Sequence, residues 1–157
     1  MIILSQRDPR WAQKHLGASS LTVGRYGCTT SCISMLSDYF GCYKSPLELA
    51  QEINLYTKPG NPLGEGLVIW EYLNKIFKGM AFDHRQRGRF DQDIMLSLKD
   101  PNKACILQVD NGQHWVVALG KTLFRNDYRI ADPWFGDKRT ALGTYRNITG
   151  SAHFVRK

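Results

Sequence analysis

The spacing of apolar residues changes near residue 100, and this change limits the folds that the chain can adopt. Before it, apolar residues recur every three to four positions, the period of a helix with one buried face. After it, short apolar segments alternate with turn residues and predict strands over 104–109, 114–119 and 128–132, with one more in 151–156. Helices followed by consecutive strands predict an α+β fold, in which N-terminal helices pack on a C-terminal antiparallel sheet.

Four helices are expected in the first part of the chain. The first ends at Gly41, because a glycine commonly terminates a helix. The second starts with Ser45-Pro46, where the serine caps the helix, the proline takes its first position and Glu48 returns a bond to the cap. The predicted helices cover 28–40, 46–54, 67–77 and 91–98.

The chain of 157 residues contains no internal repeat, low-complexity tract or Pro/Ser linker, and we expect one domain over 1–157. Its parts would be an irregular arm at 1–27, a helical part at 28–99 and a sheet part at 103–157. An apolar content of 43% fits a folded globule, which we expect to be a monomer.

The chain is basic, with 21 Lys and Arg against 14 Asp and Glu, a net charge of +7. Such a charge attracts polyanions, a class that includes nucleic acids, anionic membranes and cell-wall polymers. The densest basic stretch contains Arg85, Arg87 and Arg89, and is expected to be either a solvated loop or a patch that attracts an anionic polymer. No recognisable nucleic-acid module surrounds it, so the charge does not predict nucleic-acid binding.

The N-terminus becomes polar after Leu4, too early for a signal peptide, and no apolar run is long enough to cross a membrane. We therefore expect the chain to be cytoplasmic as synthesised, with its cysteines reduced. Cys32 and Cys105 lie in apolar patterns typical of a core, and Cys42 is expected to be structural.

Cys28 differs from the other cysteines because it lies where a loop becomes a helix, directly after Gly27. The first turn of a helix has unpaired backbone N–H groups and the positive end of the helix dipole, and both favour a thiolate. This position suits a cysteine nucleophile.

The strands that begin at His114 and end at Asp132 are joined by a short polar connection centred near Leu123. In an antiparallel pair with that centre, His114 faces Asp132, at a distance that suits an imidazole–carboxylate hydrogen bond. The imidazole would then take the proton of a thiol, while the carboxylate orients it. An oxyanion hole would combine the Cys28 N–H with a side-chain amide from the N-terminal arm.

Several short motifs occur in the order found in a known family. They are Gln6–Ala12, Leu16-Gly17, Gly27–Ser31, His114–Val117 and Tyr128–Pro133. Together they resemble the papain-like cysteine peptidases of the bacteriocin-processing type, in the free-standing form related to double-glycine leader peptidases. The resemblance covers the chain from Gln6 to about Gly136.

The resemblance implies a papain-like fold and a role for four residues. These are Cys28 as nucleophile, His114 as general base and acid, Asp132 as orienting carboxylate and Gln6 as oxyanion-hole amide. Gln108 and Gln113 are alternatives to Gln6 by residue type.

Metal binding is the rival chemistry, since Cys28, Cys32, Cys42 and His114 are all ligand types. No paired Cys-x-x-Cys or His-x-x-x-His spacing is present, and we expect neither a metal nor a cofactor. The remaining histidines have no supporting neighbours and are expected at the surface; they are His15, His84 and His153.

These observations predict a cysteine peptidase or amidase that works through an acyl-enzyme. A small basic hydrolase without a signal peptide fits a phage lysin-like enzyme that cuts peptide bonds in anionic bacterial peptidoglycan after release to the cell wall. Two alternatives stay open: a processing peptidase for a leader peptide or protein, and a non-catalytic binding module on the same fold.

Overall fold

A computed structural model describes all residues from 1 to 157, and its centre is a six-stranded antiparallel sheet. The strands follow the order β1-β6-β2-β3-β4-β5, so that β1 and β5 are the edges. Their bounds are β1 Met80–Arg87, β2 Lys103–Val109, β3 His114–Lys121, β4 Tyr128–Asp132, β5 Asp137–Thr140 and β6 Ile148–Arg156.

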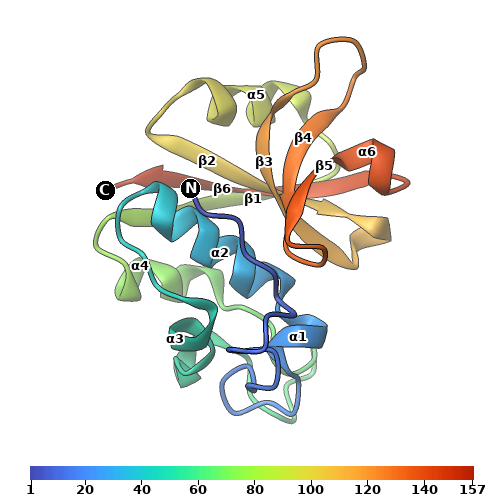
Figure 1. Ribbon diagram of the computed structural model, residues 1–157. Helices are drawn as coiled ribbons and strands as arrows, with labels where there is room; N and C mark the ends of the chain where they lie inside the picture. Colours follow the sequence, from blue (N-terminus) through green and yellow to red (C-terminus); the bar gives the residue numbers. More distant parts are fainter.

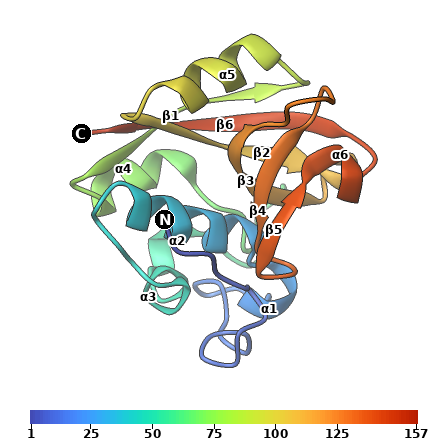
Figure 2. The same ribbon diagram turned by 45° about the horizontal axis from the view of Figure 1, so that its top comes forward.

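Helices cover both faces of this sheet. Figure 2 shows the sheet between α5 on one side and α2 and α4 on the other. In Figure 1 the helices from the first half of the chain (blue to green) gather below the strands (yellow to red). The α-helices are α1 Val23–Tyr26, α2 Cys28–Tyr39, α3 Pro46–Ala50, α4 Leu73–Ile76, α5 Asp91–Lys99 and α6 Ala141–Thr144. Single 3₁₀ turns occur at Ile53–Leu55, Trp70–Tyr72 and Asp110–Gly112.

Alternation along the central strands produces two apolar cores, one on each face. Ile106 and Val117 belong to the core under α2, whereas Leu107 and Val116 belong to the core under α5. Successive side chains of a strand point to opposite faces, and a central strand covered on both faces is therefore apolar throughout.

Helix α2 is buried around most of its circumference, because several of its residues are small. Its polar hydroxyls find partners within the protein: Ser34 donates to the Lys44 carbonyl, and Ser37 donates to the Ser34 carbonyl. The helix ends as the sequence predicts, with Gly41 at a φ of 77° in the left-handed region. The serine–glutamate capping box predicted for α3 is also present.

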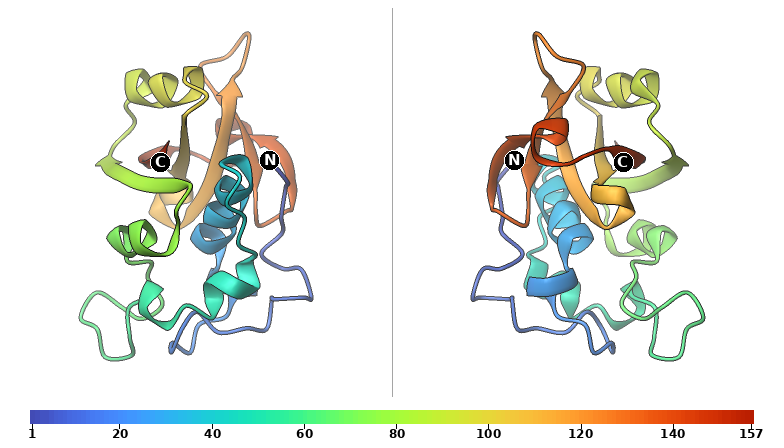
Figure 3. Two further views of the ribbon diagram at one scale, coloured as in Figure 1. Left: turned by 90° about the vertical axis from the view of Figure 1, so that its left-hand side faces the viewer. Right: turned by 90° about the vertical axis from the view of Figure 1, so that its right-hand side faces the viewer.

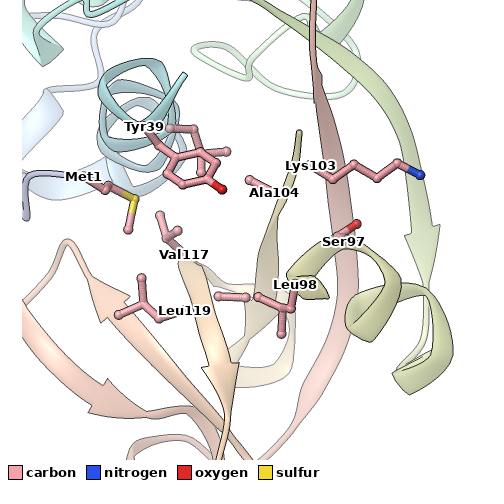
Figure 4. Close-up of a pocket in the computed structure, with 10 residues that line it drawn as sticks. Met1, Tyr39, Ser97, Leu98, Lys103, Ala104, Val117 and Leu119 are labelled. Carbon is pink, nitrogen blue, oxygen red and sulfur yellow. The ribbon is translucent and has the colours of Figure 1, made fainter. Parts of the chain in front are cut away.

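The two cores meet where β2 and β3 separate. These strands pair no further than Ile106 and Val117. A cavity of about 110 Å³ occupies the gap, with Tyr39 of α2, Leu98 of α5 and Met1 around it (Figure 4). Its lining is mostly apolar, so this cavity belongs to the packing of the two helices against the sheet.

The α+β class, with N-terminal helices on a C-terminal antiparallel sheet, is confirmed. The expectation that 28–99 is helical is wrong for 80–87, which forms the edge strand β1 beside β6. Arg85 and Arg87 therefore lie on a strand and not in a loop. This strand escapes detection because an edge strand has polar, exposed residues on much of its length, which also limits pairing with other chains.

The helix predicted over 67–77 is shorter than expected. Residues 73–76 form α4, and Trp70–Tyr72 form a 3₁₀ turn. Leu67–Ile69 are held extended instead, because the backbone of Thr57 bonds to Leu67 and Tyr56 bridges Val68.

One histidine also differs from the prediction. His153 on β6 is buried, with its Nδ1 2.8 Å from Ser97 Oγ and its Nε2 2.8 Å from Ser151 Oγ. Burial lowers the pKa of His153 to about 4, so the ring is neutral at pH 7. The two hydroxyl partners are Ser97 of α5 and Ser151 of β6. Ser97 is distant from His153 in the sequence, so the sequence does not indicate this contact.

The N-terminal arm connects the helical part to the sheet. Figure 3 shows the arm (dark blue) descending beside β4 and β5 (orange to red) towards α1. The backbone N–H of Gln6 donates to the Pro133 carbonyl at 2.8 Å. None of the helices has the length and apolar character needed to cross a lipid bilayer.

Candidate active site

Cys28 is the first residue of α2, and the close packing before it requires glycine. A Cβ placed on Gly27 would lie 2.5 Å from the Val23 carbonyl oxygen, closer than any side chain can approach. Val23 is fully buried in α1, so it cannot move aside. Glycine at this position lets α1 turn directly into α2 and places the thiol in the first helical turn.

His114 and Asp132 come together, although not in the register that the sequence predicts. Val117 pairs with Ala131, and the same register puts Asp132 across from Val116, an offset of two residues from the prediction. Side chains alternate along a strand, and an offset of two keeps His114 and Asp132 on the same face. A diagonal pair is within reach of long side chains, and His114 Nε2 lies 2.9 Å from Asp132 Oδ1.

The Asp132 carboxylate has no solvent exposure, and each of its oxygens has a partner within the protein. Oδ1 accepts from the Trp134 backbone N–H at 2.9 Å in addition to His114. Oδ2 accepts from the Tyr145 hydroxyl, whose ring centroid lies 5.4 Å from that of His114.

Tyr145 was not predicted, and no motif or spacing marks it. Its position depends on α6, which it follows directly. The buried carboxylate of Asp127 accepts from the backbone N–H groups of Leu142 and Gly143 in the first turn of that helix. Only a structure reveals this route from Asp127 through α6 to Asp132.

The electrostatics favour a charged pair of Cys28 and His114. Burial raises the pKa of the Cys28 thiol, but the hydrogen bond and the charge of His114 outweigh burial and bring the pKa below the ordinary value. Burial lowers the pKa of His114, but the bonds to Asp132 and Cys28 raise it to about 9. The pKa of Asp132 is raised by burial and lowered more by His114 and Tyr145, so that it stays ionised. The pKa shifts of Cys28 and His114 both lie in the direction that favours a thiolate beside an imidazolium.

The Gln6 side chain lies in the same hollow as Cys28 and is 1% exposed. Its Nε2 donates one N–H to the Gly24 carbonyl at 3.1 Å, which leaves the second N–H of the amide available. Its Oε1 is buried without a partner. Of the two alternatives, Gln113 lines both hollows beside Cys28, whereas Gln108 lines only one of them and its amide donates to the Gly112 carbonyl.

Two hollows meet at Cys28, and Tyr26 and Gln113 line both. The Trp134 hollow has a volume of about 380 Å³; its lining includes Gln6, His114, Trp134, Phe135 and Tyr145. The Trp70 hollow has a volume of about 500 Å³; its lining includes Leu21, Leu67, Val68, Trp70, Arg85 and Trp115. Together they form an extended cleft with the thiol at its middle, which suits a polymeric substrate.

The other cysteines do not share this environment. Cys32 and Cys105 are fully buried in the cores, as the sequence predicts. Burial raises the pKa of both thiols, to about 12 in Cys105. No group of three or more His, Cys, Asp or Glu side chains is arranged to hold a metal ion.

Comparison with known proteins gives one match. The model of the Peptidase C39 family matches residues 20–145, a segment that contains Cys28, His114 and Asp132. No curated protein matches the chain, and no solved structure does.

The lowered thiol pKa predicts selective alkylation of Cys28. With iodoacetamide at pH 7, Cys28 should react at least about 10-fold faster than Cys32, Cys42 or Cys105, because the thiolate is the reactive form. Mass spectrometry of peptides at timed intervals gives the four rates. His114→Ala should slow Cys28 and leave the other three unchanged, whereas equal slow labelling of all four would contradict the charged pair.

Proposed function

The chain belongs to the Peptidase C39 family of papain-like cysteine peptidases, and we propose that Cys28, His114 and Asp132 form its catalytic triad. The observation that carries this proposal is the 2.9 Å bond between His114 and a fully buried Asp132, beside a thiol of lowered pKa. Such a group orients the imidazole and keeps the nucleophile ionised.

In the first half of the reaction, the Cys28 thiolate attacks the carbonyl carbon of the scissile peptide bond. His114 bonds Asp132 through Nε2, so its Nδ1 is the nitrogen available to the reacting atoms. The Nδ1–H protonates the leaving amine as the C–N bond breaks, and a thioester remains on Cys28. In the second half, Nδ1 takes a proton from water, which attacks the thioester and displaces the thiolate. The new carboxylic acid is released and loses its remaining proton to solvent.

The tetrahedral intermediates place a negative charge on the former carbonyl oxygen. We assign its stabilisation to the backbone N–H of Cys28 and to the second N–H of the Gln6 amide. Bonds to Gly24 and Pro133 hold Gln6 at both its side chain and its backbone, so the donor is positioned before substrate binds.

The two hollows then receive opposite sides of the scissile bond. His114 lines the Trp134 hollow and not the Trp70 hollow. The leaving amine must receive its proton from His114, so the amine side of the substrate belongs in the Trp134 hollow. The acyl side, which stays on Cys28, belongs in the Trp70 hollow.

For the substrate, we propose the peptide bonds of bacterial peptidoglycan, reached after release of the enzyme to the cell wall. The net charge of +7 supports attraction to an anionic wall polymer. Arg85 and Arg87 form no ion pair and are available for this attraction, whereas Arg89 is bound to Asp91 and to the Asn126 carbonyl.

Peptidoglycan hydrolysis can be tested directly. Purified peptidoglycan incubated with the wild-type protein should gain free amines, measured with an amine-reactive dye, and Cys28→Ala should give none. Cys32→Ala is the matched control and should keep most of the activity, because its side chain is in the core. No amine release by the wild type would contradict the wall substrate and favour a processing peptidase.

The oxyanion-hole assignment separates Gln6 from Gln113. Gln6→Ala should lower kcat by about 10²- to 10³-fold, as expected for the loss of one donor, and Gln113→Ala should have a much smaller effect. The alkylation rate of Cys28 does not need the oxyanion hole and should stay unchanged in Gln6→Ala, which controls for misfolding. A larger loss in Gln113→Ala would transfer the role to that residue.

The charged pair predicts the alkaline limit of activity. The His114 imidazolium should lose its proton near pH 9, and kcat/KM should fall as the pH rises through that value. Asp132→Asn removes a negative charge that raises the pKa of His114, so both the NMR titration midpoint of His114 and the activity limit should move down by about one unit or more. Asp137→Asn, an exposed carboxylate next to Arg139, should leave both in place. A His114 midpoint near its ordinary 6.5 in the wild type would contradict the pair.

A further inference from the structure

Arg85 is the one charged side chain in the Trp70 hollow, apart from the Cys28 thiolate. It lies on the edge strand β1, opposite Ala152 of β6, and its side chain lines the hollow. The remaining lining consists of apolar, aromatic and neutral polar residues. A single cation in an otherwise neutral hollow favours the binding of a negatively charged group.

The Arg85 guanidinium rests on two tryptophan rings. Its central carbon lies 5.1 Å from the centroid of Trp70 and 5.2 Å from that of Trp115. The two rings are themselves 5.5 Å apart, and Trp115 adjoins His114 in the sequence. Cation–π contacts of this kind hold the guanidinium in place without using its N–H donors.

No anion inside the protein neutralises Arg85. Its guanidinium forms no ion pair and no hydrogen bond, whereas Arg10, Arg89 and Arg139 each pair with an aspartate. Partial desolvation lowers the pKa of Arg85, the neighbouring Arg87 lowers it further, and no carboxylate raises it. The Arg85 side chain is exposed to solvent, so its N–H donors are open to an anionic ligand.

We propose that Arg85 is a specificity residue that binds a carboxylate of the substrate on the acyl side of the scissile bond. The assignment of the acyl side rests on the proposed function, because it follows from His114 lining the other hollow. The guanidinium has free N–H donors on a planar group and can bind a carboxylate through two parallel hydrogen bonds. A glutamate side chain and the free α-carboxylate of a γ-linked glutamate, as found in peptidoglycan stem peptides, both offer this group.

Binding to Cys28→Ala tests the proposal without requiring hydrolysis. The probes are acetylated, amidated ten-residue peptides of Gly, Ala, Ser and Leu that carry one glutamate, either α-linked or γ-linked, at successive positions. Matched peptides carry glutamine instead. Tryptophan fluorescence, with Trp70 and Trp115 beside the site, and calorimetry report the affinity.

At one or more positions the glutamate peptide should bind about 10- to 100-fold more tightly than its glutamine match. Adding Arg85→Gln should remove this ratio and leave the affinity for the glutamine peptides within about 3-fold. Arg85→Lys should restore part of the ratio, because the charge remains. The matched control is Arg125→Gln in the β3–β4 connection, which removes the same charge from a side chain without hydrogen bonds or ion pairs and should keep the ratio.

Equal affinities for glutamate and glutamine peptides in Cys28→Ala, or no binding of any peptide, would overturn the proposal. An equal loss for both peptides in Arg85→Gln would also overturn it, since that result assigns Arg85 to packing of the tryptophans. The proposed function fails on a different result, hydrolysis that persists in Cys28→Ala. A preference limited to γ-linked glutamate supports the proposal and identifies a cell-wall source of the carboxylate.

Discussion

The buried charge of Asp132 is the constraint on which the site and much of the sheet depend. A carboxylate without solvent exposure is stable only when its oxygens are fully hydrogen-bonded, and here the partners come from β3, from the β4–β5 connection and from the end of α6. Each of these segments is therefore fixed relative to β4. The orientation of His114 is a consequence of this network, because its Nε2 is committed to Asp132, which leaves Nδ1 as its free ring nitrogen.

The thiol itself is positioned from the other half of the molecule. Gly27 allows α1 to pass into α2 without a gap, and the buried length of α2 fixes the helix against β3. The two halves are joined near the site by the N-terminal arm, where Gln6 bonds to Gly24 through its side chain and to Pro133 through its backbone. The proposed catalytic site lies at this boundary and takes one element from each half, with the cleft between them open to a substrate.

The sequence predicts most of the central strands and helix ends, because their signals are local. Gly41 and the Ser45 cap each act within one helical turn. The central strands are recognisable because their short runs of apolar residues are bounded by turn residues. Three features could not be predicted, for physical reasons. The edge strand β1 has the polarity of a loop, the partner of His153 on α5 is distant in the sequence, and Tyr145 reaches Asp132 only through a helix held by a separate buried carboxylate.

The two-residue offset between His114 and Asp132 has a consequence for how such a hairpin can vary. Strand pairing repeats every two residues, and a change of loop length by an even number preserves which side chains share a face. A change by one would turn Asp132 away from His114 and into the opposite core. Insertions and deletions in the β3–β4 connection should therefore contain an even number of residues. An odd number is tolerated where a bulge compensates for the extra residue, and the pairing of β3 with β4 has such an irregularity between Ala118 and Gly120.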